Sequence, residues 1–215
     1  MVPDWTSELM QDWALGWAQA LVLLIAVQRL GELWLARRNT RRLRALGGVE
    51  HGAGHYPLIV ALHTGWLLAL FFGIPAGAVP DPWLLGLFLL LQAGRIWVVA
   101  SLGGRWTTRI IVVPGQPLVS RGPYRVLKHP NYAIVALEIL VLPLAFGAWG
   151  LALAFGLANA ALLAVRIRAE ERALSRARED LGAAERTRTS TPLRELAPEA
   201  SASTSSATAA SDPPS

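Results

Sequence analysis

Five apolar runs set the main constraint on how this chain can fold. They occur at about 13–35, 57–72, 83–102, 132–146 and 149–165. A bilayer core of roughly 30 Å needs about 20 helical residues, so the first and third runs are long enough to cross and the others need flanking residues. The last two are separated only by a tight break around Gly147 and Gly150, which predicts a helical hairpin.

The composition agrees with a membrane protein. Hydrophobic residues make up 53% of the 215 residues and charged residues only 16%, against about 25% charged in a soluble domain. Lysine and arginine are absent from 1–28, 45–94 and 129–165. By the positive-inside rule the first span then exits into the cytoplasm. We expect an all-α, polytopic integral membrane protein of about five transmembrane helices, with its N-terminus outside and its C-terminus in the cytoplasm.

This orientation divides the chain into three parts. Residues 1–12 form an external segment, residues 13–182 the membrane core, and residues 183–215 a Ser, Thr, Ala and Pro-rich tail that is expected to be disordered. An aromatic belt is expected at the outer interface. Its tryptophans are Trp5, Trp13, Trp17, Trp83 and Trp149.

Several kinds of chemistry are excluded by what the sequence lacks. There is no cysteine, and so no thiolate metal site or cysteine nucleophile. The net charge of +5 is not arranged as a basic stripe between aromatics, so no nucleic-acid partner is expected. His51 and His55 are separated by two glycines that disfavour a helix, so we expect no metal there but a flexible loop that closes over the site.

Two charged segments lie at the predicted cytoplasmic edge. The first is Arg121–Tyr132, which reads Arg-Gly-Pro-Tyr-Arg-Val-Leu-Lys-His-Pro-Asn-Tyr, and the second is Arg166–Glu171, which reads Arg-Ile-Arg-Ala-Glu-Glu. Paired carboxylates and guanidinium groups at this depth can bind a zwitterionic ligand. The alternatives are a basic loop anchored to anionic lipid and a solvated ion-pair face. Before the first segment, β-branched residues around Pro114-Gly115 predict a small hairpin.

A few polar residues fall inside the apolar runs. Arg29 and Glu32 lie three apart in the first and are expected to pair. Glu138 should face the bundle interior, opposite Arg95, because an exposed carboxylate at that depth costs roughly 2.5–3.5 kcal/mol. Glu138 is therefore either a structural ion pair or a general base. His63 is expected to be a buried, hydrogen-bonded histidine.

The two charged segments and the hydrophobic hairpin between them resemble the isoprenylcysteine carboxyl methyltransferase family of integral membrane enzymes. The first half resembles a bacterial branch that is associated with type III polyketide synthases. The residues that carry the second likeness are Gln28–Leu33, Arg38–Asn39, Gly47–Glu50, His55–Pro57 and Leu62–His63.

The resemblance implies a bacterial plasma-membrane enzyme with S-adenosylmethionine as its cofactor at the cytoplasmic mouth. It implies no metal, and a lipophilic acceptor that enters from the membrane lipid. The implied catalytic residues are Arg166 and Glu170. The implied cofactor-binding residues are Tyr124, His129, Pro130, Tyr132, Arg168, Glu170 and Glu171.

The branch implies O-methylation of a long-chain alkylpyrone or alkylresorcinol, with a type III polyketide synthase as a pathway partner. The family's aromatic-rich C-terminal segment is replaced here by Arg172–Arg178 and the Ser/Thr/Ala tail, which makes a prenylcysteine acceptor less expected. Isoprenylcysteine carboxyl methylation and phospholipid N-methylation remain alternatives within methyl transfer. An NADPH-dependent membrane reductase and a non-catalytic membrane protein are the alternatives from other classes.

Overall fold

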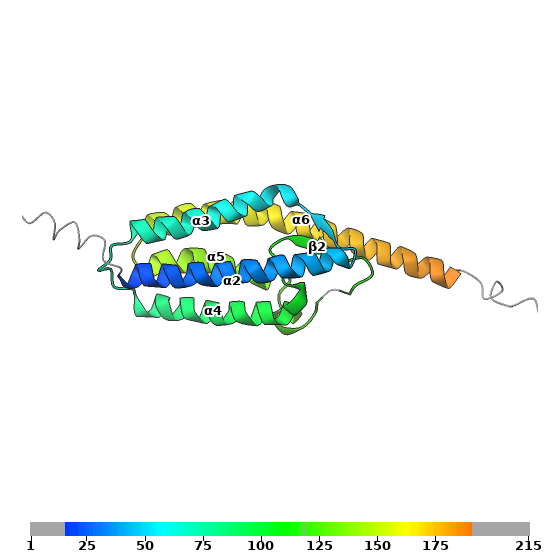
Figure 1. Cartoon of the computed structure of the whole chain (residues 1–215), viewed down its shortest axis with the longest axis horizontal. Helices are drawn as coiled ribbons and strands as arrows, with labels where there is room; N and C mark the ends of the chain where they lie inside the picture. The colour runs from blue at the N-terminus through cyan, green and yellow to red at the C-terminus, as the bar shows by residue number, and fades with distance from the viewer. Residues whose placement is uncertain (1–15, 118, 191–215) are drawn as a thin grey trace, which may run out of the picture.

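A computed structural model describes residues 16–117 and 119–190 and shows five α-helices aligned along one long axis (Figure 1). They are α2 (Trp17–Ala45), α3 (Tyr56–Gly73), α4 (Pro82–Leu102), α5 (Pro130–Ala145) and α6 (Trp149–Ser190). Four are long and apolar enough to cross a membrane, and α5 is a shorter apolar helix. The predicted helical, polytopic class is confirmed.

Exposed tryptophans gather at the end of the bundle where α2, α4 and α6 begin. Trp17, Trp83 and Trp149 are each more than two-thirds exposed. Asp81 caps α4 there, because its carboxylate accepts hydrogen bonds from the Trp83 and Leu84 backbone amides, both at 2.9 Å. Three of the expected belt residues therefore share one end, which we call the tryptophan end. Trp5, Trp13 and the rest of the predicted external segment lie outside the described residues.

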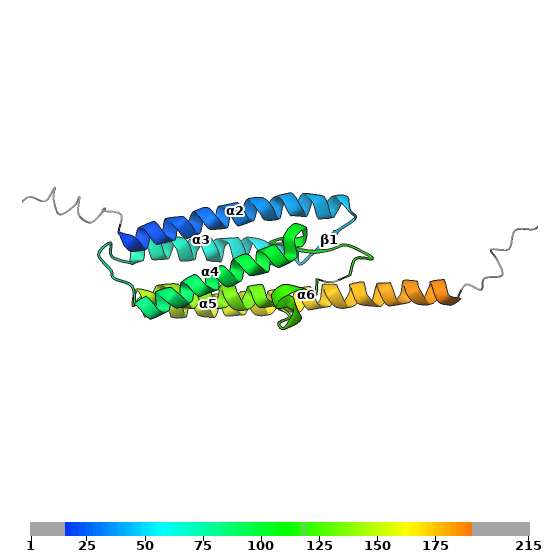
Figure 2. The same ribbon diagram turned by 90° about the horizontal axis from the view of Figure 1, so that it is seen from below.

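The opposite end, called here the charged end, carries the non-helical structure (Figure 2). A two-stranded antiparallel sheet pairs β1 (Val49–His51) with β2 (Ile110–Val112), so that Val49 lies opposite Val112. The predicted local hairpin around Pro114-Gly115 is wrong, since β2 pairs with the first half of the chain. Pro117 has no amide proton for a returning strand. Three short 3₁₀ helices complete this end: η1 (Ala53–His55), η2 (Gly103–Arg105) and η3 (Gly122–Arg125).

The predicted helical hairpin is present in α5 and α6. Gly147 joins them with a φ of 70°, a left-handed conformation that favours glycine. Pro143 lies inside α5. The helix α6 continues past the bundle to Ser190 (Figure 1). Residues 183–190 of the expected disordered tail are therefore helical, and residues 191–215 lie outside the described part of the chain.

The apolar core consists of two clusters along the bundle. The larger cluster, nearer the tryptophan end, includes the fully buried Trp66, Leu70, Phe88 and Leu142. The smaller one, at the charged end, is built on Ala36, Val98 and Trp106. Trp106 also lines the cleft that is described next, so this second cluster forms the base of the candidate site.

Candidate functional site

A cleft of about 630 Å³ opens at the charged end, between α6, the start of α5, η3 and the segment that contains β2. This volume lies within the roughly 300–1,000 Å³ range of small-molecule sites. Six of the predicted site residues line the cleft together. They are Tyr124, His129, Tyr132, Arg166, Glu170 and Glu171.

Tyr132, Arg166 and Glu170 form the hydrogen-bonded centre of the cleft. The Tyr132 hydroxyl donates to Glu170 Oε2 and accepts from Arg166 Nε at 2.8 Å. Arg166 Nη2 donates to the Thr108 backbone oxygen at 2.7 Å, and the guanidinium carbon lies 5.5 Å from the Tyr132 ring centre. The Arg166 side chain, which lines the cleft, is thus held from two sides.

His129 lies beside Tyr132 and near the carboxylates of Glu170 and Glu171. Its ring stacks on Tyr132, with ring centres 5.3 Å apart and an interplanar angle of 12°. Nδ1 lies 3.7 Å from Glu170 Oε2, and Nε2 lies 3.7 Å from Glu171 Oε1. The local sequence explains this position, because Pro130 starts α5 and leaves His129 as the residue that caps it.

The other two predicted cofactor residues do not line the cleft. Pro130 is buried at the first turn of α5 and acts through the position it gives His129. Arg168 lies on another face of α6, in a shallow surface depression with Glu171 and Arg172. Two helical positions correspond to a rotation of about 200°, so Arg168 cannot share the face of Arg166. Arg166 and Glu170 do share one, as their spacing of four predicted.

Tyr124 forms the η3 side of the cleft. Burial, followed by the negative charge of Glu170, raises the pKa of its hydroxyl to about 12. At ordinary pH the Tyr124 hydroxyl therefore stays protonated and can donate a hydrogen bond to a ligand.

The position of η3 depends on Gly122. Its φ is 60°, and a Cβ atom there would lie 2.1 Å from Ser101 Oγ, so glycine lets η3 approach α4.

The first half of the chain supports the cleft through residues to which sequence reasoning gave no role. Glu50 of β1 binds Arg109 at 2.5 Å and also binds Arg44. The Arg109 guanidinium lies 4.3 Å from the ring centre of Tyr56, whose hydroxyl is 3.2 Å from Thr108 Oγ1. Glu50 and Tyr56 both belong to the motifs quoted above for the bacterial branch. This shared membership is the sequence signal from which the group could have been predicted.

The segment around His51 and His55 is ordered, contrary to the flexible loop predicted. It forms β1 and η1; β1 pairs with β2, and the Glu50 ion pairs join it to Arg109, which precedes β2, and to Arg44 of α2. A Cβ atom at Gly52 would lie 3.3 Å from Ala169 Cβ, so the segment passes close to α6. Among the described residues, no group of three histidine, cysteine or acidic side chains could hold a metal ion.

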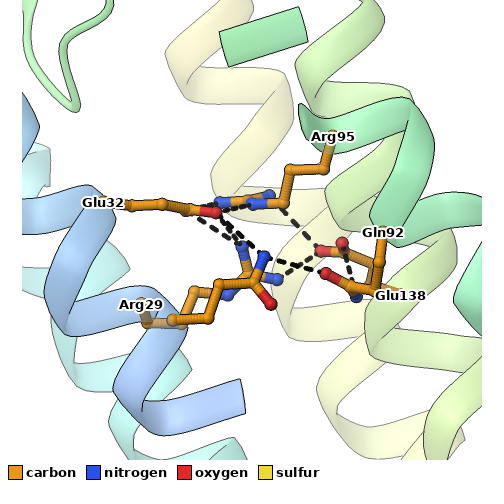
Figure 3. A network of polar contacts seen from close by, with 6 residues as sticks. Arg29, Glu32, Gln92, Arg95 and Glu138 are labelled. Carbon is orange, nitrogen blue, oxygen red and sulfur yellow. Dashed lines mark hydrogen bonds and ion pairs between the residues drawn. The ribbon is translucent and has the colours of Figure 1, made fainter. Parts of the chain in front are cut away.

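A separate layer of charged side chains from α2, α4 and α5 crosses the bundle (Figure 3). On α2 it lies between Ile25 of the larger apolar cluster and Ala36 of the smaller one. Arg29 binds Glu32 at 3.1 Å and Glu138 at 2.6 Å. Arg95 binds Glu32 through two nitrogens, at 2.6 and 2.5 Å, and Glu138 at 3.3 Å. The predicted pairs of Arg29 with Glu32 and of Arg95 with Glu138 are both confirmed.

Two glutamines complete this ionic layer. Gln92 donates to Glu138 Oε1 at 3.0 Å, and Gln28 donates to Gln92 at 3.0 Å. Glu138 is only 2% exposed and is not among the residues that line the cleft, so its position favours the structural ion pair over the general base. His63 was expected to be buried and hydrogen-bonded. Its Nδ1 lies 2.8 Å from the Ile59 backbone oxygen of its own helix, which confirms the hydrogen bond, but the side chain is only partly buried.

Comparison with known proteins places this geometry in a family. The sequence pattern of the isoprenylcysteine carboxyl methyltransferase family matches residues 84–176, which hold nearly all of α4, all of η3 and α5, and α6 as far as the cleft-lining Ser175. A Bacillus subtilis relative, named uncharacterized protein YpbQ, is 43% identical over 158 residues, which cover 72% of this chain and 94% of that protein. No solved structure matches the chain at a significant level.

Proposed function

The chain belongs to the isoprenylcysteine carboxyl methyltransferase family, and from this premise we propose that its cleft carries out S-adenosylmethionine-dependent methylation of a lipophilic acceptor. Members of the family are methyltransferases that use S-adenosylmethionine. The observation that carries the proposal to this chain is the gathering of Tyr132, Arg166 and Glu170 with His129 in one cleft.

The side chains of the cleft fit the chemistry of S-adenosylmethionine. That cofactor carries an ammonium and a sulfonium, a carboxylate, ribose hydroxyls and an aromatic base. Glu170 and Glu171 supply negative charge for the cationic groups, and Lys128 supplies positive charge for the carboxylate. The rings of Tyr124 and His129 offer flat surfaces to the base. Arg168 is left out of the proposed set, because it lies on another face of α6.

The protein's own residues would act on the acceptor by positioning it and by handling charge. Bound S-adenosylmethionine supplies an electrophilic methyl group, whose in-line transfer gains much of its rate from correct placement of the acceptor oxygen. Arg166, held by Thr108 and Tyr132, would stabilise an anionic acceptor oxygen. Glu170 would accept the proton that a hydroxyl acceptor releases, directly or through the Tyr132 hydroxyl with which it shares a hydrogen bond.

For the acceptor we propose a long-chain alkylpyrone or alkylresorcinol. The support is the likeness of Gln28–Leu33 and Gly47–Glu50 to the polyketide-associated branch, together with an apolar side of the cleft built from Leu43, Leu102 and Trp106. A type III polyketide synthase would then supply the acceptor. Lysine and arginine are absent from the α3–α4 and α5–α6 connections at the tryptophan end and gather in the connections at the charged end. This asymmetry supports an orientation with the charged end in the cytoplasm and the tryptophan end outside.

Purified protein in lipid nanodiscs tests this proposal. We expect transfer of labelled methyl from S-adenosylmethionine to an alkylresorcinol or alkylpyrone, and loss of about 0.8 kcal/mol of acceptor binding for each buried methylene removed from the chain. Methylation of a farnesylcysteine analogue or of phosphatidylethanolamine, with none of either polyketide lipid, would contradict the acceptor assignment alone. Binding of NADPH in place of S-adenosylmethionine would contradict methyl transfer itself and favour a reductase.

A further inference from the structure

A second cavity, of about 560 Å³, adjoins the cleft at the charged end. It lies between the end of α2, the end of α4 and residues 116–117 and 119–121. Seven of its eleven lining residues also line the cleft, among them Leu43, Leu102 and Arg105. Three arginines, Arg42, Arg105 and Arg121, line it. We call it the arginine cavity, and none of the proposed catalytic or cofactor-binding residues lines it.

The positive charge of the arginine cavity is not balanced by acidic side chains. Arg121 Nε donates to the Ser101 backbone oxygen at 2.8 Å, and Arg105 donates to the Pro117 backbone oxygen. Within residues 16–117 and 119–190, none of its three arginines pairs with a carboxylate, and no aspartate or glutamate lines the cavity. By contrast, the nearby Arg44 and Arg109 both pair with Glu50. The cavity thus presents three guanidinium groups to whatever occupies it.

The depth of the arginine cavity corresponds to the phosphates of a lipid leaflet. Trp17 and Trp83 mark the tryptophan end of α2 and α4. At 1.5 Å per residue, Leu102 lies about 29 Å along α4 from Trp83, and Arg42 lies about 37 Å along α2 from Trp17. The hydrocarbon core is about 30 Å thick. The cavity therefore begins at the edge of the hydrocarbon and extends about 7 Å beyond it, into the headgroup layer.

The lining is also amphipathic. Leu46 provides apolar surface beside the arginines, and Leu43 and Leu102 are common to this cavity and to the apolar side of the cleft. A ligand with a charged head and an aliphatic part fits this lining, and its aliphatic part would lie next to the proposed acceptor. We propose that the arginine cavity binds the phosphate group of an anionic membrane lipid such as phosphatidylglycerol. Guanidinium groups suit this ligand, because they form strong charge-assisted hydrogen bonds to phosphate oxygens. Because the cavity shares a wall with the cleft, a bound lipid would also cover that side of the site.

Native mass spectrometry of the full chain in detergent tests the proposal without any methyl transfer. We expect the protein to retain phosphatidylglycerol in preference to phosphatidylcholine, and an excess of inorganic phosphate to leave the lipid bound. The double variant Arg42→Gln/Arg121→Gln should lose about fivefold in lipid affinity for each arginine removed. The double variant Arg42→Lys/Arg121→Lys keeps the charge but loses the forked N–H donors, and its affinity should lie between those of the glutamine variant and the wild type.

The matched control is Arg41→Gln/Arg125→Gln, which removes two exposed arginines from the same end that do not line the cavity. Its phosphatidylglycerol affinity should remain that of the wild type. Equal losses in the cavity variant and the control would mean a diffuse surface attraction and would overturn the site. Equal retention of the two lipids, or displacement of phosphatidylglycerol by inorganic phosphate, would overturn the assignment to an anionic lipid.

Discussion

Replacing Glu138 by glutamine is the sharpest perturbation of the ionic layer. The side chain keeps its size, but the layer then holds two guanidinium groups and one carboxylate. Glu138 is 2% exposed, and its carboxylate accepts hydrogen bonds from Arg29 at 2.6 Å, Arg95 at 3.3 Å and Gln92 at 3.0 Å. Removing one partner of a buried ion pair typically costs about 3–5 kcal/mol, because a charge is left uncompensated. We expect Glu138→Gln to lower the free energy of unfolding by about that amount.

The assay is unfolding of the detergent-solubilised protein in a titration with dodecyl sulfate, followed by circular dichroism. Arg44→Gln is the control, because it breaks an ion pair whose arginine is 54% exposed, and exposed pairs contribute about 0–1 kcal/mol. The double variant Arg29→Gln/Glu138→Gln leaves the layer with one positive charge, on Arg95, and one negative charge, on Glu32. Because these balance, it should be more stable than Glu138→Gln alone.

Two results would refute this reasoning. A Glu138→Gln protein within about 1 kcal/mol of the wild type would mean that the layer does not hold the helices together. A variant of normal stability that binds S-adenosylmethionine but no longer transfers methyl would make Glu138 the general base, despite its position outside the cleft.

Three further perturbations address the cleft and its supports. Tyr132→Phe keeps the ring stack on His129 but removes the hydroxyl between Arg166 and Glu170, and should lower kcat/KM by about tenfold in a methyl-transfer assay; an unchanged value would exclude the hydroxyl from the reaction. Asn39→Ala removes hydrogen bonds to the Gly103 and Trp106 backbone oxygens, at 3.0 and 2.8 Å, and should cost about 1–3 kcal/mol of stability by the same titration, whereas equal stability would mean that water replaces the amide. Burial acts to raise the pKa of Glu50, but hydrogen bonds from Arg109 and Arg44 outweigh it and hold the pKa below its usual value. This contribution to stability is complete above the unfolded pKa of about 4.3 and is lost as the pH falls through the lower folded value. Melting curves should therefore show an acid-dependent loss in the wild type that is smaller in Glu50→Gln, and identical pH profiles would contradict the assignment.

The helices and the ionic layer could be predicted from the sequence because each depends on local or general constraints. Apolar runs must form helices in a bilayer, since no water is present to satisfy the backbone. The Glu138 carboxylate needs a partner at its own depth, and the sequence predicted Arg95 for that position; the closer contact with Arg29, at 2.6 Å, was not predicted. Arg166 and Glu170 shared a face because four residues complete about one helical turn.

The contacts that join the two halves of the chain could not be predicted in this way. Pairing of Val49 with Val112 and of Glu50 with Arg109 joins residues about 60 positions apart, and no local pattern sets that register. The hairpin at Pro114-Gly115 was predicted from turn residues. These residues do form a turn, but β2 pairs with β1 and not with a strand that follows the turn. Arg168 was included because it lies in the motif, although helical geometry turns it away from Arg166.

Calorimetric titration of S-adenosylmethionine into purified wild-type protein and two α6 variants tests the central claim most directly. Glu170→Gln changes a carboxylate in the cleft, while Arg172→Gln changes an exposed charge on another face of the same helix. The account predicts wild-type binding, a Kd that rises about tenfold or more in Glu170→Gln, and an unchanged Kd in Arg172→Gln. Failure of the folded wild-type protein to bind S-adenosylmethionine, or equal affinities in all three proteins, would contradict it.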